Sequence, residues 1–223
     1  MTELVQPTGS RTPLTKERVL DAAIELADRD GIDGLSMRRL GQELGVEAMA
    51  LYRHVRDKED LLDGAVEAVI AGIETPPPSD DWKRSMRDLA LASRRHMLSH
   101  PWAPALIVKR TTVGPATLRH IDLVLGILSG AGFSIDMAHH ALHVLGSRVF
   151  GFTQDPFNDA TDADADAAQS AAFARSIATS LPHVAELAVA ASHDGTLGGC
   201  DDDVEFAFGL DLVLDGLERL RAG

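Results

Sequence analysis

The chain has 223 residues, a formal net charge of −13 and a single cysteine, Cys200. This length is sufficient for a small domain followed by a larger one, and one cysteine excludes an intrachain disulfide or a zinc site built from several cysteines. No apolar run is long enough to span a membrane and the N-terminal residues lack the pattern of a secretory signal, so we expect a cytoplasmic protein without a membrane partner.

The periodicity of the apolar residues predicts an all-α fold. Only 4% of the residues are aromatic, and alanine and leucine dominate the periodic segments. The first predicted helix runs from about residue 15 to residue 30, with Val19, Ala23 and Leu26 among its apolar residues and Gly31 at its end. We expect this helix to cover the segment that follows it.

Residues 35–58, LSMRRLGQELGVEAMALYRHVRDK, have the pattern of two short helices joined by a tight turn. Ser36 can cap the first helix, Gly45 stands where that helix must stop, and Gly41 keeps the crossing point small. With Leu51 and Val55 turned inward, the outward-facing residues are Ala48, Met49, Tyr52 and Arg53, with Arg56 and Lys58 just beyond. This pattern is typical of a helix-turn-helix that reads the major groove of DNA. The alternative is a helical hairpin whose charges only solvate its surface.

The net charge of the chain opposes DNA binding, but the distribution of charge favours it. Residues 36–58 contain five Lys and Arg against three Asp and Glu, a local charge of +2. Much of the acidic excess lies in residues 155–168, DPFNDATDADADAA. We therefore expect a few phosphate contacts and modest nonspecific affinity, rather than a broad basic surface.

The rest of the chain is predicted to form a linking helix and a larger helical domain. The linking helix runs from about residue 57 to residue 73, before a run of three prolines at 76–78. Further helices are predicted at 80–98, 102–110, 115–131, 135–154, 168–193 and 204–221. The predicted domains are 14–73 and 79–223. In the last helix, Gly209 and Gly216 allow another helix to approach closely, so we expect this helix to pack against a neighbour.

The leading helix and the segment GIDGLSMRRLGQELGVEAMALYRHVRDKEDLLDGAV resemble, over about residues 14–73, the DNA-binding domain of the TetR family of transcriptional regulators. The segments GFSIDMAHHALHVLGSRVFGF and VEFAFGLDLVLDGLERL resemble the regulatory domain of its tetracycline repressor branch. The resemblance implies a three-helix headpiece followed by a larger ligand-binding and dimerisation domain. It also implies a homodimeric repressor that a small-molecule effector releases from a palindromic double-stranded DNA operator. Our hypothesis is that the linking helix transmits occupancy of the effector pocket to the spacing of the two DNA-reading helices.

The resemblance also suggests how the headpiece contacts DNA. Arg38 falls where the tetracycline repressor carries a base-reading arginine, and a guanidinium can donate two hydrogen bonds to guanine. Three residues match family positions that hold phosphates: Ser36, Tyr52 and Lys58. Ala48 and Met49 offer only apolar contact to thymine methyl groups, so the operator should differ from the tetracycline one. His54 could reach a phosphate or be a partly buried structural residue.

A ligand pocket in the larger domain is the second implication of the resemblance. Helical phase gives these candidate lining residues: Leu89, Ser93, Met97, Trp102, Ile107, Ile127, His139, Leu142, His143 and Phe150. A mostly apolar set with a few polar groups is what a small-molecule pocket requires. Tetracycline is not the expected ligand. The asparagine and phenylalanine that hold it in the tetracycline repressor fall at Leu89 and Ser93, and the magnesium-binding histidine falls near Ile107 or Val108.

Eight of the nine histidines follow residue 78, which raises the alternative of a metal-responsive regulator. His139 and His143 lie four residues apart, so both imidazoles could bind one metal. The other interpretation, histidines that line a cavity or an interface without metal, is favoured because no HExxH motif or cysteine pair supports a metal site. We expect no cofactor, and no catalytic constellation indicates an enzyme. A ligand-binding dimer without operator specificity is a further alternative.

The aspartates of the acidic segment resemble the start of a calcium loop, at Asp162, Asp164 and Asp166. The loop lacks the glycine and the glutamate that its sixth and twelfth positions require, so an acidic loop without calcium is expected.

Overall fold

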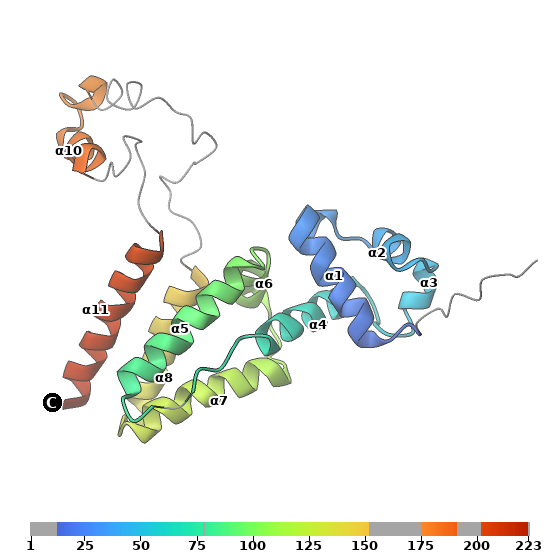
Figure 1. Cartoon of the computed structure of the whole chain (residues 1–223), viewed down its shortest axis with the longest axis horizontal. Helices are drawn as coiled ribbons and strands as arrows, with labels where there is room; N and C mark the ends of the chain where they lie inside the picture. The colour runs from blue at the N-terminus through green and yellow to red at the C-terminus, as the bar shows by residue number, and fades with distance from the viewer. Residues whose placement is uncertain (1–12, 78, 152–174, 191–201, 223) are drawn as a thin grey trace, which may run out of the picture. The chain divides into compact units, whose positions relative to one another are not determined.

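The computed structural model describes residues 13–77, 79–151, 175–190 and 202–222, and these residues form helices and connecting turns without a strand. The all-α prediction is therefore confirmed. In chain order the elements are α1 (Lys16–Asp30), the 3₁₀ turn η1 (Ile32–Gly34), α2 (Met37–Leu44), α3 (Ala48–Leu51), α4 (Lys58–Ala71), α5 (Trp82–Leu98), α6 (Ala103–Lys109), α7 (Pro115–Gly130), α8 (Ile135–Gly151), α10 (Pro182–Ala190) and α11 (Asp202–Ala222) (Figure 1). No helix among the described residues is both long and apolar enough to cross a bilayer.

The chain divides into two compact units. The first unit comprises the residues up to Gly72 together with Ser99–Leu118, and the second comprises Ile73–Leu98 together with the residues from Arg119 onward. One division between the units falls between Gly72 and Ile73. The placement of residues 99–118, which contain α6, with the first unit differs from the predicted domains, because contacts far apart in the sequence decide it.

Side-chain caps define the helices of the first unit. The hydroxyl of Ser36 accepts a hydrogen bond from the backbone N–H of Arg39 at 3.3 Å, and the carboxylate of Asp57 accepts one from Asp60 N–H at 2.8 Å. Gly45 ends α2 in the left-handed conformation, with φ 66°. Each cap satisfies a backbone donor that the first turn leaves unpaired, so these boundaries are set by local sequence, as predicted.

The core of the first unit is built by α1 to α4. One large residue from each helix is almost fully buried: Leu26, Leu40, Leu51 and Leu61. The helix α3 is only one turn long, shorter than the sequence pattern suggested. It ends at Leu51, and the N–H groups of His54 and Val55 donate to the carbonyl of Leu51 in the turn that follows. This turn still buries Val55, so the apolar pattern alone did not reveal where the helix stops.

The second unit has its core between α5, α8 and α11, with the C-terminal part of α7 packed on it. Its largest fully buried residue is Phe206 of α11. The guanidinium groups of Arg94 and Arg148 lie over the Phe206 ring, 4.6 and 5.0 Å from its centroid. These contacts join α5, α8 and α11 around one aromatic side chain.

The predicted single helix at 168–193 is helical at 175–177 and 182–190 where the structure describes it, but it is interrupted between these two stretches. Residues 178–180 form a turn, Leu181 is not helical, and α10 begins at Pro182. A proline disfavours helical geometry in the residue before it and is well accommodated at the first helical position, so a break at residue 181 is expected. The acidic segment at 155–168, Cys200 and the predicted helix up to residue 174 lie outside the described residues.

Candidate DNA-binding surface and ligand pocket

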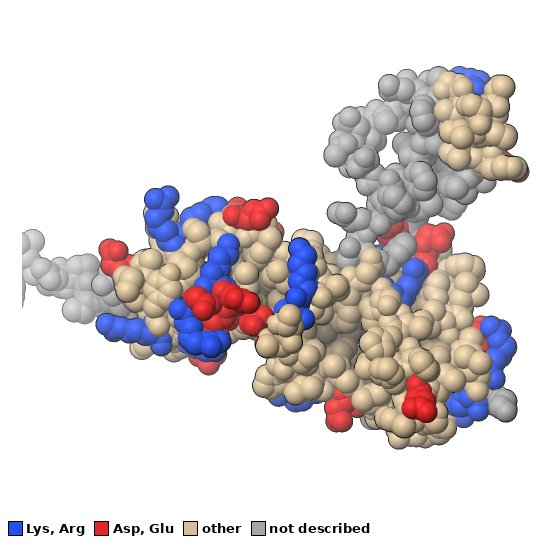
Figure 2. All heavy atoms as spheres, turned by 180° about the vertical axis from the view of Figure 1, so that it is seen from behind, with Lys and Arg blue, Asp and Glu red and all other residues tan. Residues whose placement is uncertain are grey.

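The outward face of α2 and α3 carries most of the residues predicted to contact DNA. Met49 is 74% exposed and Tyr52 43% exposed, while Leu51 between them is fully buried. Arg38, Arg53 and Lys58 are also exposed. Figure 2 shows Lys and Arg side chains on the visible face of the first unit, mixed with Asp and Glu. The surface is therefore cationic in places, without being a continuous basic patch.

Two neighbouring arginines at the start of α2 have different roles. Arg39 donates from Nη1 to the carbonyl oxygen of Gly34 at 3.0 Å and from Nη2 to Oδ2 of Asp30 at 2.5 Å. Arg38 is exposed and makes no hydrogen bond or ion pair with any residue that the structure describes. Arg39 thus holds α2 against the end of α1, and Arg38 projects an unpaired guanidinium from the same turn.

One nearby acid, Glu43, and the cap residue Ser36 are arranged in a way that is compatible with the binding of a negatively charged backbone. Arg29 binds Glu43 through two hydrogen bonds of 3.1 and 3.2 Å, and these bonds lower the pKa of Glu43 below its ordinary value. The charge of this acid is therefore largely compensated beside the surface. The Ser36 hydroxyl accepts from Arg39 N–H, so its own proton can still be donated to a phosphate.

Three predicted contact residues lie nearby with different exposure. Lys58 is the first residue of α4, next to the capping Asp57, and is exposed. Ala48 and His54 are half-buried. The backbone of His54 donates to Leu51 O at 2.8 Å, which fixes the turn after α3.

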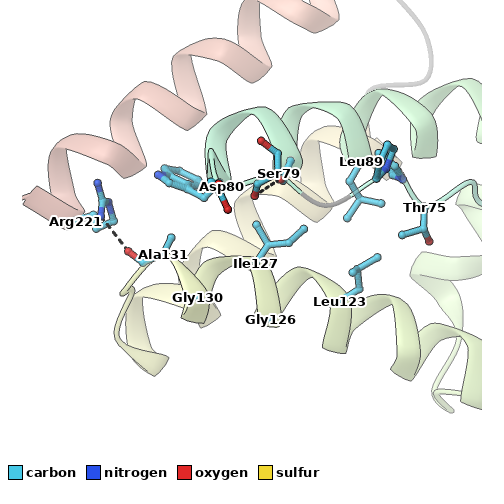
Figure 3. Close-up of a pocket in the computed structure, with 14 residues that line it drawn as sticks. Thr75, Ser79, Asp80, Leu89, Leu123, Gly126, Ile127, Gly130, Ala131 and Arg221 are labelled. Atoms are coloured by element: carbon cyan, nitrogen blue, oxygen red, sulfur yellow. Dashed lines mark hydrogen bonds between the residues drawn. The ribbon is translucent and has the colours of Figure 1, made fainter.

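A cavity of about 790 Å³ lies within the second unit. It is bounded by residues 75–77, 79 and 80, the N-terminal half of α5, the C-terminal half of α7 and Arg221 of α11. Figure 3 shows Leu89 pointing from α5 toward Leu123 and Ile127 on α7, with Arg221 at one end. The cavity has mostly apolar walls with polar groups at its rim, as small-molecule sites usually do.

Hydrogen bonds fix the rim of this cavity. The indole N–H of Trp82 donates to Oε2 of Glu218 at 2.8 Å, and the Trp82 ring packs edge-on against Phe133 with centroids 4.8 Å apart. Arg221 donates to the carbonyl of Ala131 at 3.0 Å and also binds Glu218. These hydrogen bonds and the ring contact hold the rim residues in place.

Of the ten predicted lining residues, Leu89 and Ile127 line this cavity. Ser93 and Met97 are buried farther along α5, where Ser93 donates to Leu89 O at 2.8 Å. Four residues are on α8: His139 and His143 are exposed, and Leu142 and Phe150 pack on the core. Trp102 and Ile107 belong to the first unit. The predicted residues therefore do not lie around one cavity. Helical phase predicts which face of a helix points inward, but it does not predict at which position along the helix a cavity is found.

Sequence reasoning missed the residues before α5 that bound the cavity, such as Thr75 and Asp80, and also Trp82 and Arg221. The proline run was interpreted only as a linker. Its stiffness was an available signal, because prolines hold the chain extended over whatever it crosses.

The paired histidines of α8 are close together. Nε2 of His139 and Nε2 of His143 are 3.0 Å apart on an exposed face. Within the described residues, no group of three or more His, Cys, Asp or Glu side chains is arranged to hold a metal ion.

The sequence matches two family models. Residues 19–65 match bacterial regulatory proteins of the tetR family, and residues 74–221 match the tetracyclin repressor-like C-terminal domain. The chain belongs to the TetR family. The resemblance found in the sequence is thereby confirmed.

Several relatives of this TetR-family protein cover nearly the same length. The transcriptional repressor DrrR1 of Streptomyces coeruleorubidus is 31% identical over 219 residues, covering 96% of this chain and 81% of the relative. The class C tetracycline repressor from Escherichia coli is 31% identical over 211 residues, covering 93% and 92%. The crystal structure of apo ActR from Streptomyces coelicolor has a TM-score of 0.77 at 27% identity, covering 95% and 98%. ActR in complex with actinorhodin has a TM-score of 0.76 at 27% identity, covering 95% and 100%.

These matches establish the TetR-family protein as a ligand-responsive, DNA-binding transcriptional repressor. Its relatives are transcriptional regulators, and the alternatives of a metal-responsive regulator and of a dimer without operator specificity are not favoured.

Proposed function

We propose that the protein binds a palindromic operator as a homodimer in the cytoplasm, and that a small molecule in the cavity of the second unit releases it. The observation that carries this proposal is the contrast between Arg38 and Arg39. One guanidinium is held within the headpiece and its neighbour is exposed and unpaired among the described residues. A rigidly mounted fork of donors at the start of α2 is suited to the major-groove edge of guanine.

The other proposed DNA contacts are of two kinds: some bind phosphates and position the headpiece, and others touch the bases. Ser36, Tyr52 and Lys58 bind phosphates, and Arg53 and His54 add further contacts beside them. Ala48 and Met49 pack against thymine methyl groups. Because few cations are involved, the salt dependence of binding should be shallow for a DNA-binding protein.

An exposed apolar stripe on α11 supports the homodimer. Val204, Phe208 and Leu212 are spaced by four residues and are 59%, 62% and 56% exposed. Val144 on the neighbouring α8 is 46% exposed. Apolar side chains aligned along one helix face are typical of an interface between two copies. Two headpieces about 34–36 Å apart would read successive major grooves of a palindrome.

The cavity is the proposed effector site. Its volume of about 790 Å³ lies within the range of roughly 300–1,000 Å³ typical of ligand sites. Leu89 and Ile127 would contact the apolar body of the effector, and Asp80 and Arg221 its polar groups. ActR, which resembles this chain, has been crystallised with actinorhodin, so this compound is the first probe to test.

Selection of bound sequences from random duplex DNA at physiological salt tests DNA recognition. The wild-type protein should enrich a palindrome. Arg38→Ala should lose or relax it, while Arg38→Lys should keep phosphate-level affinity with relaxed choice at one base, because an ammonium cannot make the two-pronged contact. Absence of enrichment at any salt concentration would refute the assignment of the headpiece.

Titration of the operator complex with actinorhodin tests release. Complete release requires that the ligand favour the released conformation by about 10⁴-fold. Ile127→Trp fills part of the cavity and changes no residue of the headpiece, so it should weaken release and leave operator affinity unchanged. If no small molecule tested shifts operator affinity, the effector proposal fails while DNA recognition stands.

A further inference from the structure

The histidine pair of α8, His139 and His143, lies outside both the DNA-binding surface and the effector cavity. The two residues are four apart in a helix of 17 residues, so their side chains project from the same face, one turn apart. Both side chains are exposed, and neither borders the cavity of the second unit. The proposed function therefore assigns no role to this pair.

The two imidazole rings of the pair are in contact with each other. Nε2 of His139 and Nε2 of His143 are 3.0 Å apart, and the ring planes are inclined by 84° with their centroids 4.7 Å apart. The helix that carries the rings is anchored, because Ala138, Ala141 and Leu145 on its other face are buried in the core of the second unit. Both nitrogens are therefore held within reach of a single ion.

The distance between the two nitrogens is that of neighbouring ligands on one metal ion. Histidine nitrogens bind a first-row metal at about 2.0–2.1 Å. With that bond length, two nitrogens 3.0 Å apart subtend an angle of about 91–97° at the ion. Adjacent ligands in square-planar and octahedral complexes are about 90° apart, whereas tetrahedral Zn²⁺ sites require about 109°. The pair therefore fits Cu²⁺ or Ni²⁺ better than Zn²⁺.

Cation binding at this pair requires the movement of only one proton. In the metal-free pair, one ring donates its N–H to the nitrogen of the other. In the complex, each ring carries its proton on Nδ1, and each Nε2 gives a lone pair to the ion. No third His, Cys, Asp or Glu among the described residues joins the pair in a ligand group, so water would fill the remaining positions. Imidazole ligands favour Cu²⁺ and Ni²⁺ over Mg²⁺ and Ca²⁺, which prefer oxygen.

We propose that His139 and His143 chelate a divalent cation of the Cu²⁺ and Ni²⁺ class, one ion per chain, and that the ion links two successive turns of α8. The sequence alone favoured histidines without metal, because no supporting motif was present, and the distance between the two nitrogens changes that interpretation. The helix α8 contacts α5 and α11 in the core of the second unit. A cation that binds only the folded helix therefore stabilises this unit, while release from the operator stays with the effector cavity.

Calorimetric titration of the full-length protein, purified without a histidine tag, tests the site. The probes are NiCl₂, CuCl₂, ZnCl₂ and MgCl₂. The tightest site should take up one Ni²⁺ per chain, Cu²⁺ should bind more tightly than Ni²⁺ or Zn²⁺, and Mg²⁺ should not bind. The electron paramagnetic resonance spectrum of the Cu²⁺ complex should show coupling to two nitrogens, which identifies two imidazole ligands directly.

His139→Ala and His143→Ala each remove one of the two ligands. The second nitrogen binds an ion that the first already holds, so the loss of either should weaken Ni²⁺ binding by about a hundredfold. Both residues are exposed, so the helix content measured by circular dichroism should be unchanged. His140→Ala is the matched control, because His140 is an exposed histidine of the same helix with its ring centroid 5.8 Å from that of His139. Ni²⁺ should raise the thermal unfolding midpoint of wild type and of His140→Ala only.

The chelate is overturned if Ni²⁺ and Cu²⁺ bind no better than Mg²⁺, or if both variants of the pair bind Ni²⁺ as wild type does. An equal loss of binding in His140→Ala would also overturn it, because the ion would then not depend on the paired nitrogens. The proposed function stands in each of these cases, since neither operator selection nor release by the effector involves these histidines. A failure of operator selection would likewise leave the cation titration unaffected.

Discussion

Replacement of Gly41 by alanine tests the geometry of the helix-turn-helix. A Cβ at this position would lie 2.9 Å from the carbonyl oxygen of Val46 and 3.2 Å from the backbone nitrogen of Ala48. Both are backbone atoms, so α2 and the turn must move apart. Overpacking of this kind costs about 1–3 kcal/mol. Alanine gains up to about 1 kcal/mol over glycine within a helix. We expect the free energy of unfolding of the first unit to fall by about 1–2 kcal/mol.

Urea unfolding followed by tryptophan fluorescence measures this loss in a Trp82→Phe background. The chain has two tryptophans, and Trp102 then reports on the first unit alone. Gly64→Ala on α4 is the matched control in the same unit, because a Cβ there would meet only the flexible end of the Leu20 side chain. Operator binding should weaken in Gly41→Ala, since α3 shifts relative to α2. If Gly41→Ala is as stable as Gly64→Ala, the inferred close approach of the two helices is wrong.

Two further predictions concern acid stability and assembly. Burial alone would raise the pKa of Glu67 on α4, but hydrogen bonds from the first turn of α7 hold it below its ordinary value of 4.5 in the folded state. Its contribution to stability is complete above that pH and is lost as the pH falls through the lowered pKa. Urea midpoints of the first unit should therefore fall on acidification below pH 4.5 more steeply in wild type than in Glu67→Gln, and equal slopes would contradict this. Phe208→Glu should convert the dimer to monomers in sedimentation velocity. Leu98→Glu, at an exposed apolar site on α5 and so outside the stripe, should not; equal behaviour of the two would place the interface elsewhere.

Features fixed by neighbouring residues were predictable from the sequence. The cap at Ser36, the stop at Gly45 and the start of α4 at Asp57 each depend on residues within one turn. The length of α3 was not predictable in the same way. Val55 is buried by a single helical turn followed by a reverse turn, and a longer helix would bury it equally, so the apolar pattern does not distinguish the two. Pro182 carried a local signal that the prediction of one long helix overlooked.

Most of the residues around the ligand cavity could not be predicted from the sequence, and Trp102 illustrates the reason. Trp102 is apolar enough to suggest a pocket wall, yet its indole N–H is bound to Asp28, 74 residues away. No periodicity in the sequence relates these two residues. The position of a cavity along a helix likewise depends on the segment that borders it, here residues 75–77, 79 and 80, and no periodicity in the sequence reveals that segment.

The short α3 has a consequence for how such a repressor can diverge. Its stability within the fold depends on one inward residue, Leu51, while Met49 and Arg53 face solvent. Exposed positions of this kind usually tolerate substitution within about 0.5 kcal/mol. After gene duplication, a copy could therefore exchange these side chains and acquire a different regulon while its fold, its assembly and its effector remained those of the parent.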